Sequence, residues 1–340
     1  MKHLLSVEQL SPSQIDQILK TADSFREVGT RKIKKVPTLR GRTVCNLFFE
    51  PSTRTRISFE LAAKRLSADV VNFVGDARSS LSKGESFKDT AQTLQAMGVD
   101  AIVVRHSSAG APLRLSRWVE ASVINGGDGA HEHPTQALLD LYSIREHFPS
   151  FKGLRVGIVG DVGHSRVARS NVIGLKTMGA HAILVGPPTL MPPAVESWGV
   201  EVANDLEVVL PTLDVVYLLR MQRERQNEQL VPSLREYAAF WGLDLRRTGL
   251  LKPEAVIMHP GPMNRGIEIA AEVADLERSI ITDQVTNGVA VRMSLLYHML
   301  GAEERRPGQA RRDSAQLALG SDVADDAPSF AGHPGAVAVG

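Results

Sequence analysis

Cysteine is nearly absent from this sequence, since Cys45 is the only one among 340 residues. A disulfide within the chain is therefore impossible, and such a composition is typical of reducing compartments. We expect a cytoplasmic protein. Cys45 lies inside an apolar run, where a thiol is buried and unreactive, so it is a poor candidate for a catalytic nucleophile.

Long apolar runs and a large net charge are missing as well. Glu8 and Asp16 soon interrupt the residues after Met1, and later segments are too short to cross a bilayer, so we expect neither a signal peptide nor a membrane partner. The 39 basic and 38 acidic residues give a formal charge of +1. No overall field therefore favours nucleic acid, and any preference for anions must be local.

Signatures of several common enzyme classes are also absent. Gly160-Asp161-Val162-Gly163 resembles half of a dinucleotide fingerprint, but Ile158 stands where the first glycine belongs. The chain has no Gly-Lys-Ser/Thr phosphate loop and no Gly-x-Ser-x-Gly elbow. No cluster of ligands at suitable spacing completes a metal site around His131 and His133. We therefore expect chemistry without NAD, ATP, metal or any other cofactor.

Strand-like and helix-like runs alternate along most of the chain. Such alternation predicts an α/β fold with two doubly wound parallel sheets, because each helix returns the chain to the start of a parallel strand. The predicted strands are 44–49, 70–74, 101–105, 123–125, 155–161, 182–185, 214–220 and 255–259, and the predicted helices include 11–28, 53–66, 87–97, one ending at Trp118, and 137–147.

The order of these runs predicts two domains with the active site in the cleft between them. The first spans residues 1–148 and is completed by a C-terminal helix over 284–300, and the second spans 149–283. Residues 301–340 are rich in Ala, Gly, Asp and Arg with few large apolar side chains. We expect them to form a mobile tail that carries no chemistry.

The segment Glu50-Pro51-Ser52-Thr53-Arg54-Thr55-Arg56 links the first predicted strand to a helix. Ser52 suits an N-cap, so the backbone N–H groups of the next three residues would face any group above the helix N-terminus. Hydroxyl and guanidinium groups add further donors, which predicts a phosphate site. The plainer alternative is a well-capped helix with surface arginines.

Other polar residues follow predicted strands at the same sheet edges. Arg105 ends one strand, and Gly126-Gly127-Asp128-Gly129 forms a loop that leads into residues 131–136. In the second half, Arg166 begins a helix, while Arg220 ends a strand. Ligands of open α/β sheets bind outside the carboxyl ends of the strands, so these residues should face one cleft. The alternative for either arginine is a surface ion pair.

Two motifs, Ser52-Thr53-Arg54-Thr55-Arg56 and His133-Pro134-x-Gln136, closely resemble those of the carbamoyltransferase family, and the resemblance covers residues 1–300 in order. Ornithine-type members carry a His-Cys-Leu-Pro turn, whereas His259-Pro260-Gly261-Pro262 and Arg220-x-Gln222 look like the catalytic chains of the aspartate type. The resemblance implies transfer of a carbamoyl group from carbamoyl phosphate to the amino group of L-aspartate, which yields N-carbamoyl-L-aspartate and phosphate for pyrimidine biosynthesis.

The resemblance also implies a role for each matching residue. Thr55, Arg105 and His133 would reach the carbonyl oxygen, Arg54 the leaving phosphate, and Gln136 the carbamoyl amide. The implied carbamoyl phosphate site is Ser52, Thr53, Arg54, Thr55, Arg105, His133, Gln136, Gly261 and Pro262, and the implied aspartate site is Lys83, Arg166, Arg220 and Gln222.

The family's assembly is a homotrimer with shared active sites, so the resemblance implies that Lys83 reaches a neighbouring subunit, accompanied by Ser79 or Ser80. From sequence alone, residues 79–85 read equally well as a solvated turn. Association with regulatory chains or a dihydroorotase stays open. A carbamoyltransferase for another amine, or a non-catalytic binding module, are the alternative functions.

Overall fold

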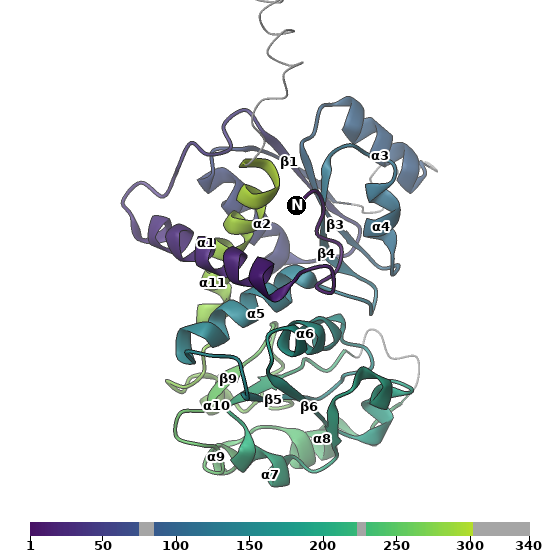
Figure 1. Ribbon diagram of the computed structural model, residues 1–340. Coiled ribbons are helices and arrows are strands. Elements are labelled where there is room, and N and C mark those ends of the chain that lie inside the picture. The colour runs from purple at the N-terminus through teal and green to yellow at the C-terminus, as the bar shows by residue number, and fades with distance from the viewer. Residues whose placement is uncertain (75–84, 223–228, 302–340) are drawn as a thin grey trace, which may run out of the picture. The chain divides into compact units, whose positions relative to one another are not determined.

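The structure is a computed structural model that describes residues 1–74, 85–222 and 229–301 (Figure 1). Lys83, its neighbours Ser79 and Ser80, and the segment 302–340 lie outside the described residues. The predictions made for them therefore stay predictions.

The first half of the chain forms a four-stranded parallel sheet in the order β2-β1-β3-β4. Strands β1, β3 and β4 are buried on both faces, as parallel sheets covered by helices are, whereas the edge strand β2 is largely exposed. The elements are β1 (Thr43–Phe48), α2 (Thr53–Arg65), β2 (Asp69–Val74), α3 (Phe87–Ala96), β3 (Ala101–His106), α4 (Ala111–Ser116), β4 (Ser122–Asp128) and α5 (Pro134–His147).

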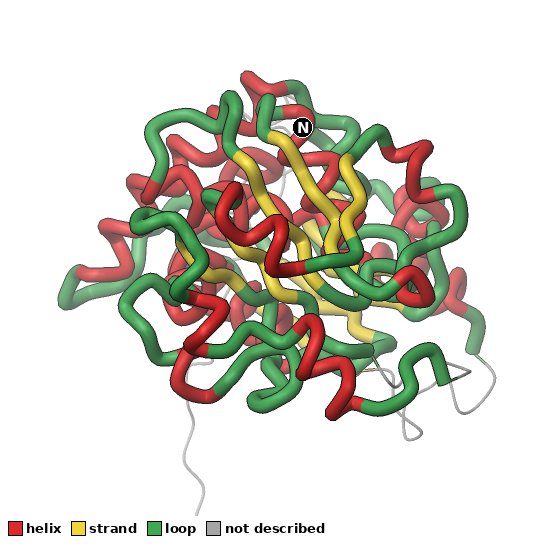
Figure 2. The backbone as a smooth tube through the Cα atoms, turned by 90° about the horizontal axis from the view of Figure 1, so that it is seen from below, coloured by secondary structure: helices red, strands yellow, loops and turns green. Residues whose placement is uncertain are grey.

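The second half forms a five-stranded parallel sheet in the order β7-β6-β5-β8-β9. Strands lie side by side with helices around them in Figure 2. The two parallel sheets confirm the predicted fold class. The elements are β5 (Arg155–Val159), α6 (Arg166–Thr177), β6 (His181–Val185), β7 (Glu201–Ala203), α7 (Leu206–Val209), β8 (Val215–Leu218), α8 (Leu234–Trp241), α9 (Leu245–Thr248), β9 (Val256–Met258) and α10 (Ala271–Ala274), with short 3-10 turns at Pro188–Leu190, Val195–Trp198 and Leu210–Thr212.

Helices from the two ends of the chain pack together. α1 (Pro12–Thr30) begins with a capping box between Ser11 and Gln14, and buries its apolar face against α11 (Ile281–Leu296), which continues as a π turn over Tyr297–Gly301. α11 also contacts α2 and α5, and α5 contacts α6 of the second half. Figure 1 shows α5 between the two sheets, so one continuous apolar core reaches from one sheet to the other.

Several element boundaries differ from the sequence prediction. α4 ends at Ser116 instead of continuing through Trp118, whose ring packs against Phe87 with the centroids 5.6 Å apart. β4 continues to Asp128, so most of the predicted glycine loop is strand. α5 begins at Pro134, which suits the first turn of a helix because that turn needs no N–H donor there. β7 is short and mostly exposed, so its sequence shows no apolar pattern from which a strand could be predicted.

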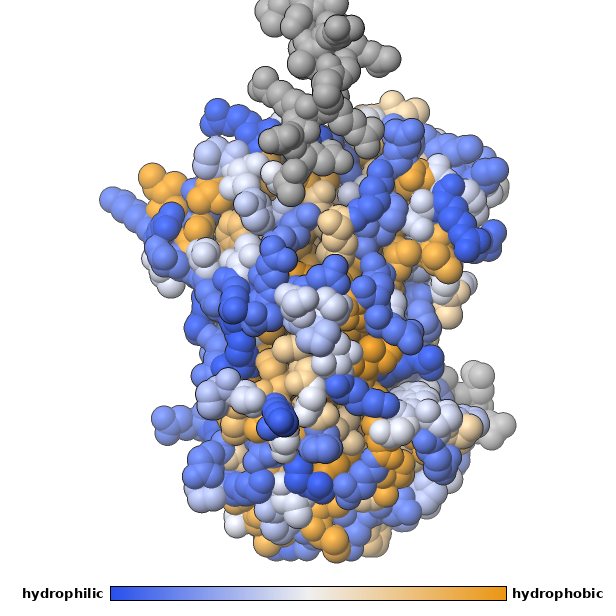
Figure 3. All heavy atoms as spheres, viewed as in Figure 1, coloured by the Kyte–Doolittle hydropathy of each residue, from blue (hydrophilic) through white to orange (hydrophobic). Residues whose placement is uncertain are grey.

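Hydrophilic side chains cover most of the face drawn in Figure 3, with apolar ones in small groups. Among the helices in the described ranges, none combines the length and apolar character that a membrane span requires.

Candidate active site

A cavity of about 490 Å³ opens where segments from both sheets meet. The segment 50–55 after β1 and Arg105 at the end of β3 line it from the first sheet, and residues 165–167, 220, 222 and 259–263 line it from the second. Every residue predicted for the two substrate sites lines this cavity, apart from Lys83, which lies outside the described residues. The structure therefore brings the described part of the predicted set together.

Sheet topology explains why these residues meet. In the first sheet the chain continues from β1 to β2 on one side and to β3 on the other, so β1 and β3 form a switch point, and Phe48 pairs with Arg105 there. In the second sheet β5 and β8 form the corresponding switch point, which Arg220 follows. Ligands of open α/β sheets bind at such points, because the loops diverge there and leave a crevice.

Helix α2 presents its N-terminus to the cavity. Ser52 occupies the N-cap position, as the sequence predicts, and its hydroxyl makes no capping hydrogen bond. The first hydrogen bond within the helix runs from the Arg56 N–H to the Ser52 carbonyl oxygen at 3.3 Å. The N–H groups of residues 53–55 and the serine hydroxyl therefore face the cavity as donors for an anion.

Three more helices begin at the same cavity. His133 is the N-cap of α5, Ser165 is the N-cap of α6, and Ile281 opens α11. The aligned peptide dipoles place partial positive charge at each of these ends, which favours bound anions. This concentration of positive potential is invisible in a net charge of +1.

A single carboxylate organises two of the arginines. Arg166 Nη2 donates to Glu50 Oε2 at 2.6 Å, and Arg105 Nε lies 3.4 Å from the same oxygen. Arg105 Nη1 also donates to the Gly126 carbonyl oxygen at 3.2 Å. Gly127 has φ +115°, and a Cβ there would lie 3.1 Å from Arg166 Nε and 3.2 Å from Arg105 Nη1. The glycines predicted as a loop thus make room for both guanidiniums.

His133 is buried beside the α2 N-terminus. Its Nε2 lies 3.4 Å from Thr55 Oγ1, and its Nδ1 lies 3.4 Å from Thr135 Oγ1. Its backbone N–H donates to Ser170 Oγ at 2.8 Å, which holds it against α6. Burial, reinforced by nearby positive charges such as Arg105, keeps the pKa of His133 well below its ordinary value. A neutral imidazole can donate one hydrogen bond to a carbonyl oxygen without adding charge.

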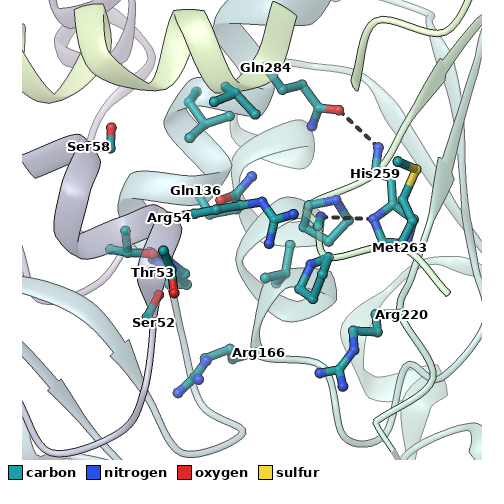
Figure 4. Close-up of a pocket in the computed structure, with 18 of the residues that line it drawn as sticks. Ser52, Thr53, Arg54, Ser58, Gln136, Arg166, Arg220, His259, Met263 and Gln284 are labelled. Atoms are coloured by element: carbon teal, nitrogen blue, oxygen red, sulfur yellow. Dashed lines mark hydrogen bonds between the residues drawn. The ribbon is translucent and has the colours of Figure 1, made fainter. Parts of the chain in front are cut away.

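The turn after β9 approaches from the other side of the cavity. The His259 N–H donates to Gln284 Oε1 at 2.9 Å, and His259 Nδ1 accepts from the Gly261 N–H at 2.8 Å (Figure 4). Gly261 has φ +65°, and a Cβ there would lie 2.9 Å from Arg54 Nε. Only glycine therefore lets this backbone approach the guanidinium so closely.

The region after β8 is held by a buried acid. Asp161 Oδ2 accepts from the Gln222 N–H at 3.2 Å, and Asp161 Oδ1 lies 2.7 Å from His164 Nδ1. Arg166 and Arg220 both reach the cavity from this second half of the chain, as Figure 4 shows. Their side chains therefore face the donors of α2 across one space.

Sequence reasoning missed one buried cation of this cavity. Arg292, in the middle of α11, is 4% exposed, and its Nη1 donates to Ser58 Oγ at 2.9 Å. Its guanidinium also lies over the Phe59 ring at 5.1 Å, and burial lowers its pKa to about 10. An isolated arginine in an apolar helix gives no sequence signal, because its partners are more than 200 residues away. Asp140 and Gln284, both buried, were missed as well, and they meet each other across 144 residues.

The sequence also raised the question of whether Cys45 is reactive and whether His131 and His133 hold a metal ion. Cys45 is fully buried in β1, and burial raises the pKa of its thiol to about 12, which confirms that it is a poor nucleophile. His131 pairs with Asp128, with Nδ1 and Oδ2 3.1 Å apart, whereas His133 faces the cavity. Over the described ranges, no three His, Cys, Asp or Glu side chains gather in a way that could hold a metal ion.

Comparison with known proteins agrees with this geometry. Residues 2–146 match the carbamoyl-P binding domain of the aspartate/ornithine carbamoyltransferases, and residues 152–299 match their Asp/Orn binding domain. The aspartate carbamoyltransferase catalytic subunit of Thermobifida fusca is 58% identical over 308 residues, which cover 91% of this chain and 98% of that protein.

Solved structures of the family have the same architecture. A crystal structure of aspartate transcarbamoylase from Trypanosoma cruzi in complex with carbamoyl phosphate and aspartate aligns with a TM-score of 0.80 at 31% identity, covering 88% of this chain and 97% of that one. Ornithine carbamoyltransferase from Pyrococcus furiosus aligns with a TM-score of 0.76 at 27% identity, covering 89% of this chain and 98% of that one. The chain therefore belongs to the aspartate/ornithine carbamoyltransferase family.

Proposed function

We propose that this chain catalyses the transfer of a carbamoyl group from carbamoyl phosphate to L-aspartate. The aspartate amino nitrogen forms a bond to the carbonyl carbon, the bond from that carbon to the phosphate oxygen breaks, and the amine gives up a proton that the departing phosphate can accept. The products are N-carbamoyl-L-aspartate and phosphate. No side chain has to act as a nucleophile, which fits the absence of cysteine among the described residues that line the cavity.

The charge of the cavity carries this proposal. Arg54, Arg105, Arg166, Arg220 and Arg292 all line it. Among the described lining residues Glu50 is the one carboxylate, and it already contacts two of these arginines. Together with four helix N-termini, this favours two anionic substrates over an anion and a cation.

We assign the donors of the cavity to two groups, one for the phosphate and one for the carbonyl oxygen. Residues 52–55 supply backbone N–H and hydroxyl donors for the phosphate, joined by the Arg54 guanidinium. The Thr55 hydroxyl, together with Arg105 and His133, would hold the carbonyl oxygen, where negative charge grows as the amine attacks. Gln136 and the Gly261–Pro262 backbone would hold the carbamoyl amide.

Aspartate would bind on the side of the second sheet. Arg166, Arg220 and Gln222 offer donors for its two carboxylates, and Lys83 would add a cation. An ornithine side chain ends in an ammonium group, which these guanidiniums would repel. The similarity to aspartate carbamoyltransferases at 58% identity supports the same choice.

The proposed acceptor is directly testable. With carbamoyl phosphate in excess, phosphate release should depend on L-aspartate, and L-ornithine should support a rate at least about a hundredfold lower, because it places an uncompensated charge in the pocket. A coupled phosphate assay with each acceptor, and with none, measures this. A preference for ornithine would contradict the aspartate assignment, and release without any acceptor dependence would contradict carbamoyl transfer.

We further propose that the chain acts in pyrimidine biosynthesis in the cytoplasm, as the catalytic subunit of a homotrimer with shared active sites. The names of the relatives, which are catalytic subunits, support a larger assembly. Regulatory chains or a dihydroorotase could associate with it. Within the chain, we assign residues 1–148 with helix 284–300 to carbamoyl phosphate and residues 149–283 to aspartate, and the tail 301–340 to neither.

The shared site predicts that two inactive variants restore activity together. Homotrimers of Lys83→Ala and of Arg105→Ala should each be nearly inactive. After reversible dissociation and joint reassembly, a hybrid of either 2:1 composition has a single boundary at which an intact Arg105 faces an intact Lys83 of the next subunit, as a closed ring requires. Activity should then return. Each variant reassembled alone is the control, and verified hybrids as inactive as their parents would place Lys83 in its own chain's site or in none.

A further inference from the structure

Asp140 is a buried carboxylate surrounded by neutral donors. It lies on α5, one helical turn after Gln136, and is 1% exposed. Its Oδ1 accepts from Gln136 Nε2 at 3.0 Å and from Gln284 Nε2 at 2.7 Å. Its Oδ2 accepts from Asn171 Nδ2 at 2.9 Å and from the Tyr217 hydroxyl at 2.7 Å. The donors belong to α5, α11, α6 and β8, so this one side chain joins elements of both halves of the chain.

The carboxylate dictates which way the Gln136 amide faces. A side-chain amide has a donating end and an accepting end, whereas an ionised carboxylate only accepts. Gln136 must therefore turn its Nε2 toward Asp140, because the opposite orientation would set two oxygens against each other. Gln136 also lines the cavity, so its Oε1 is the acceptor that remains for a ligand. A carbamoyl NH₂ group is a matching donor.

The same oxygen fixes a second amide, that of Gln284. Its Nε2 donates to Asp140 Oδ1, so its Oε1 must face the other way, where it accepts from the His259 N–H at 2.9 Å (Figure 4). His259 Nδ1 then accepts from the Gly261 N–H at 2.8 Å. This chain of hydrogen bonds runs from Asp140 to the turn whose backbone we assign to the carbamoyl amide.

We propose that Asp140 is a positioning residue that orients Gln136 and, through Gln284, the His259–Pro262 turn, so that both present acceptors to the NH₂ group of carbamoyl phosphate. The inference rests on the proposed carbamoyl transfer. Asp140 does not line the cavity, so it acts through these two glutamines and touches no substrate.

The protonation state of Asp140 fits this role. Burial raises its pKa to about 6, and hydrogen bonds from its four neighbours oppose that rise by favouring the carboxylate. At pH 8 the group is therefore an ionised acceptor, with no proton that would meet a glutamine donor.

The first test compares Asp140→Ala with Ser143→Ala. Ser143 lies one turn further along α5, is 0% exposed, and accepts from Asn287 Nδ2 of α11 at 3.0 Å, so the control removes a buried hydrogen bond between the same two helices. Asp140→Ala should lower kcat/KM for carbamoyl phosphate at least about tenfold at pH 8, the scale of one or two misplaced hydrogen bonds. The inhibition constant of inorganic phosphate should stay within about twofold, because the cradle at residues 52–55 is not bonded to Asp140. Ser143→Ala should change neither quantity.

A double-mutant cycle separates positioning from general support of the fold. In a Gln136→Ala, Gln284→Ala background, Asp140→Ala should cost less than about twofold in kcat/KM, because the groups it orients are gone. An equal loss in both backgrounds, or an equal weakening of phosphate and carbamoyl phosphate, would overturn the inference. If Asp140→Ala fails to fold, Gln284→Leu keeps the carboxylate and its hydrogen bond from Gln136, and removes the two hydrogen bonds that connect Asp140 to His259. An unchanged KM for carbamoyl phosphate in that variant would likewise overturn it.

The parent enzyme in the same assay distinguishes a failure of the proposed function from a failure of the positioning role of Asp140. A parent that does not carbamoylate aspartate contradicts the proposed function. An active parent with purely additive effects of Asp140 contradicts only the positioning role.

Discussion

The Arg105→Ala variant is expected to fold normally and to lose about 3 kcal/mol of transition-state stabilisation, which lowers kcat by about two orders of magnitude. The guanidinium of Arg105 is held in place by the Gly126 carbonyl oxygen and lies near Glu50. Its side chain is 14% exposed, so its charge acts in a space with little water to screen it. Because we place the carbonyl oxygen beside it, this donor should matter most when negative charge develops there.

The matched control for that experiment is Arg114→Ala. Arg114 is an exposed arginine of α4 that lies over the Trp118 ring at 5.1 Å, away from the cavity, so its loss should leave kcat unchanged. Far-ultraviolet circular dichroism and the melting temperature check the fold of both variants. Turnover of Arg105→Ala within about tenfold of the parent, in a folded sample, would contradict its assignment to the carbonyl oxygen.

Arg220→Ala is expected to raise the KM for aspartate about ten- to a hundredfold, the scale of a hydrogen bond to a charged group, and to change the KM for carbamoyl phosphate far less. Arg220 lines the cavity from the second sheet, on the far side from the phosphate cradle. Arg166 is a less selective test, because its Nη2 lies 2.6 Å from Glu50 Oε2. Without Arg166, that carboxylate would repel both anionic substrates. The KM for aspartate should still rise more than the KM for carbamoyl phosphate.

Steady-state kinetics with each substrate varied in turn measures this selectivity. Arg246→Ala is a suitable control, because Arg246 also belongs to the second half but pairs with Glu207 at the surface. Equal changes in the two KM values for Arg220→Ala would remove Arg220 from the aspartate pocket.

Local patterns in the sequence determined much of this protein. Alternating apolar runs predicted two parallel sheets, because the spacing of apolar residues along the chain differs between a buried strand and a helix with one buried face. The Ser52–Thr55 cradle could also be predicted, since its donors are consecutive residues at one helix start. The lack of a capping hydrogen bond from the Ser52 hydroxyl could not be predicted, because it depends on how the chain folds around the helix end.

Only the tertiary structure decided which buried polar residues serve the site. α5 is buried almost all round, so its sequence gives no polar face that would single out Asp140. The donors to Asp140 include Gln284, which is 144 residues away, and Arg292 meets Ser58 across 234 residues. Such contacts depend on how α11 packs against α5 and α2, and a pattern of neighbouring residues carries no information about that packing. The sequence by itself therefore determined the sheets and the consecutive phosphate donors, whereas the packing of distant helices decided how the amides and charges around them are oriented.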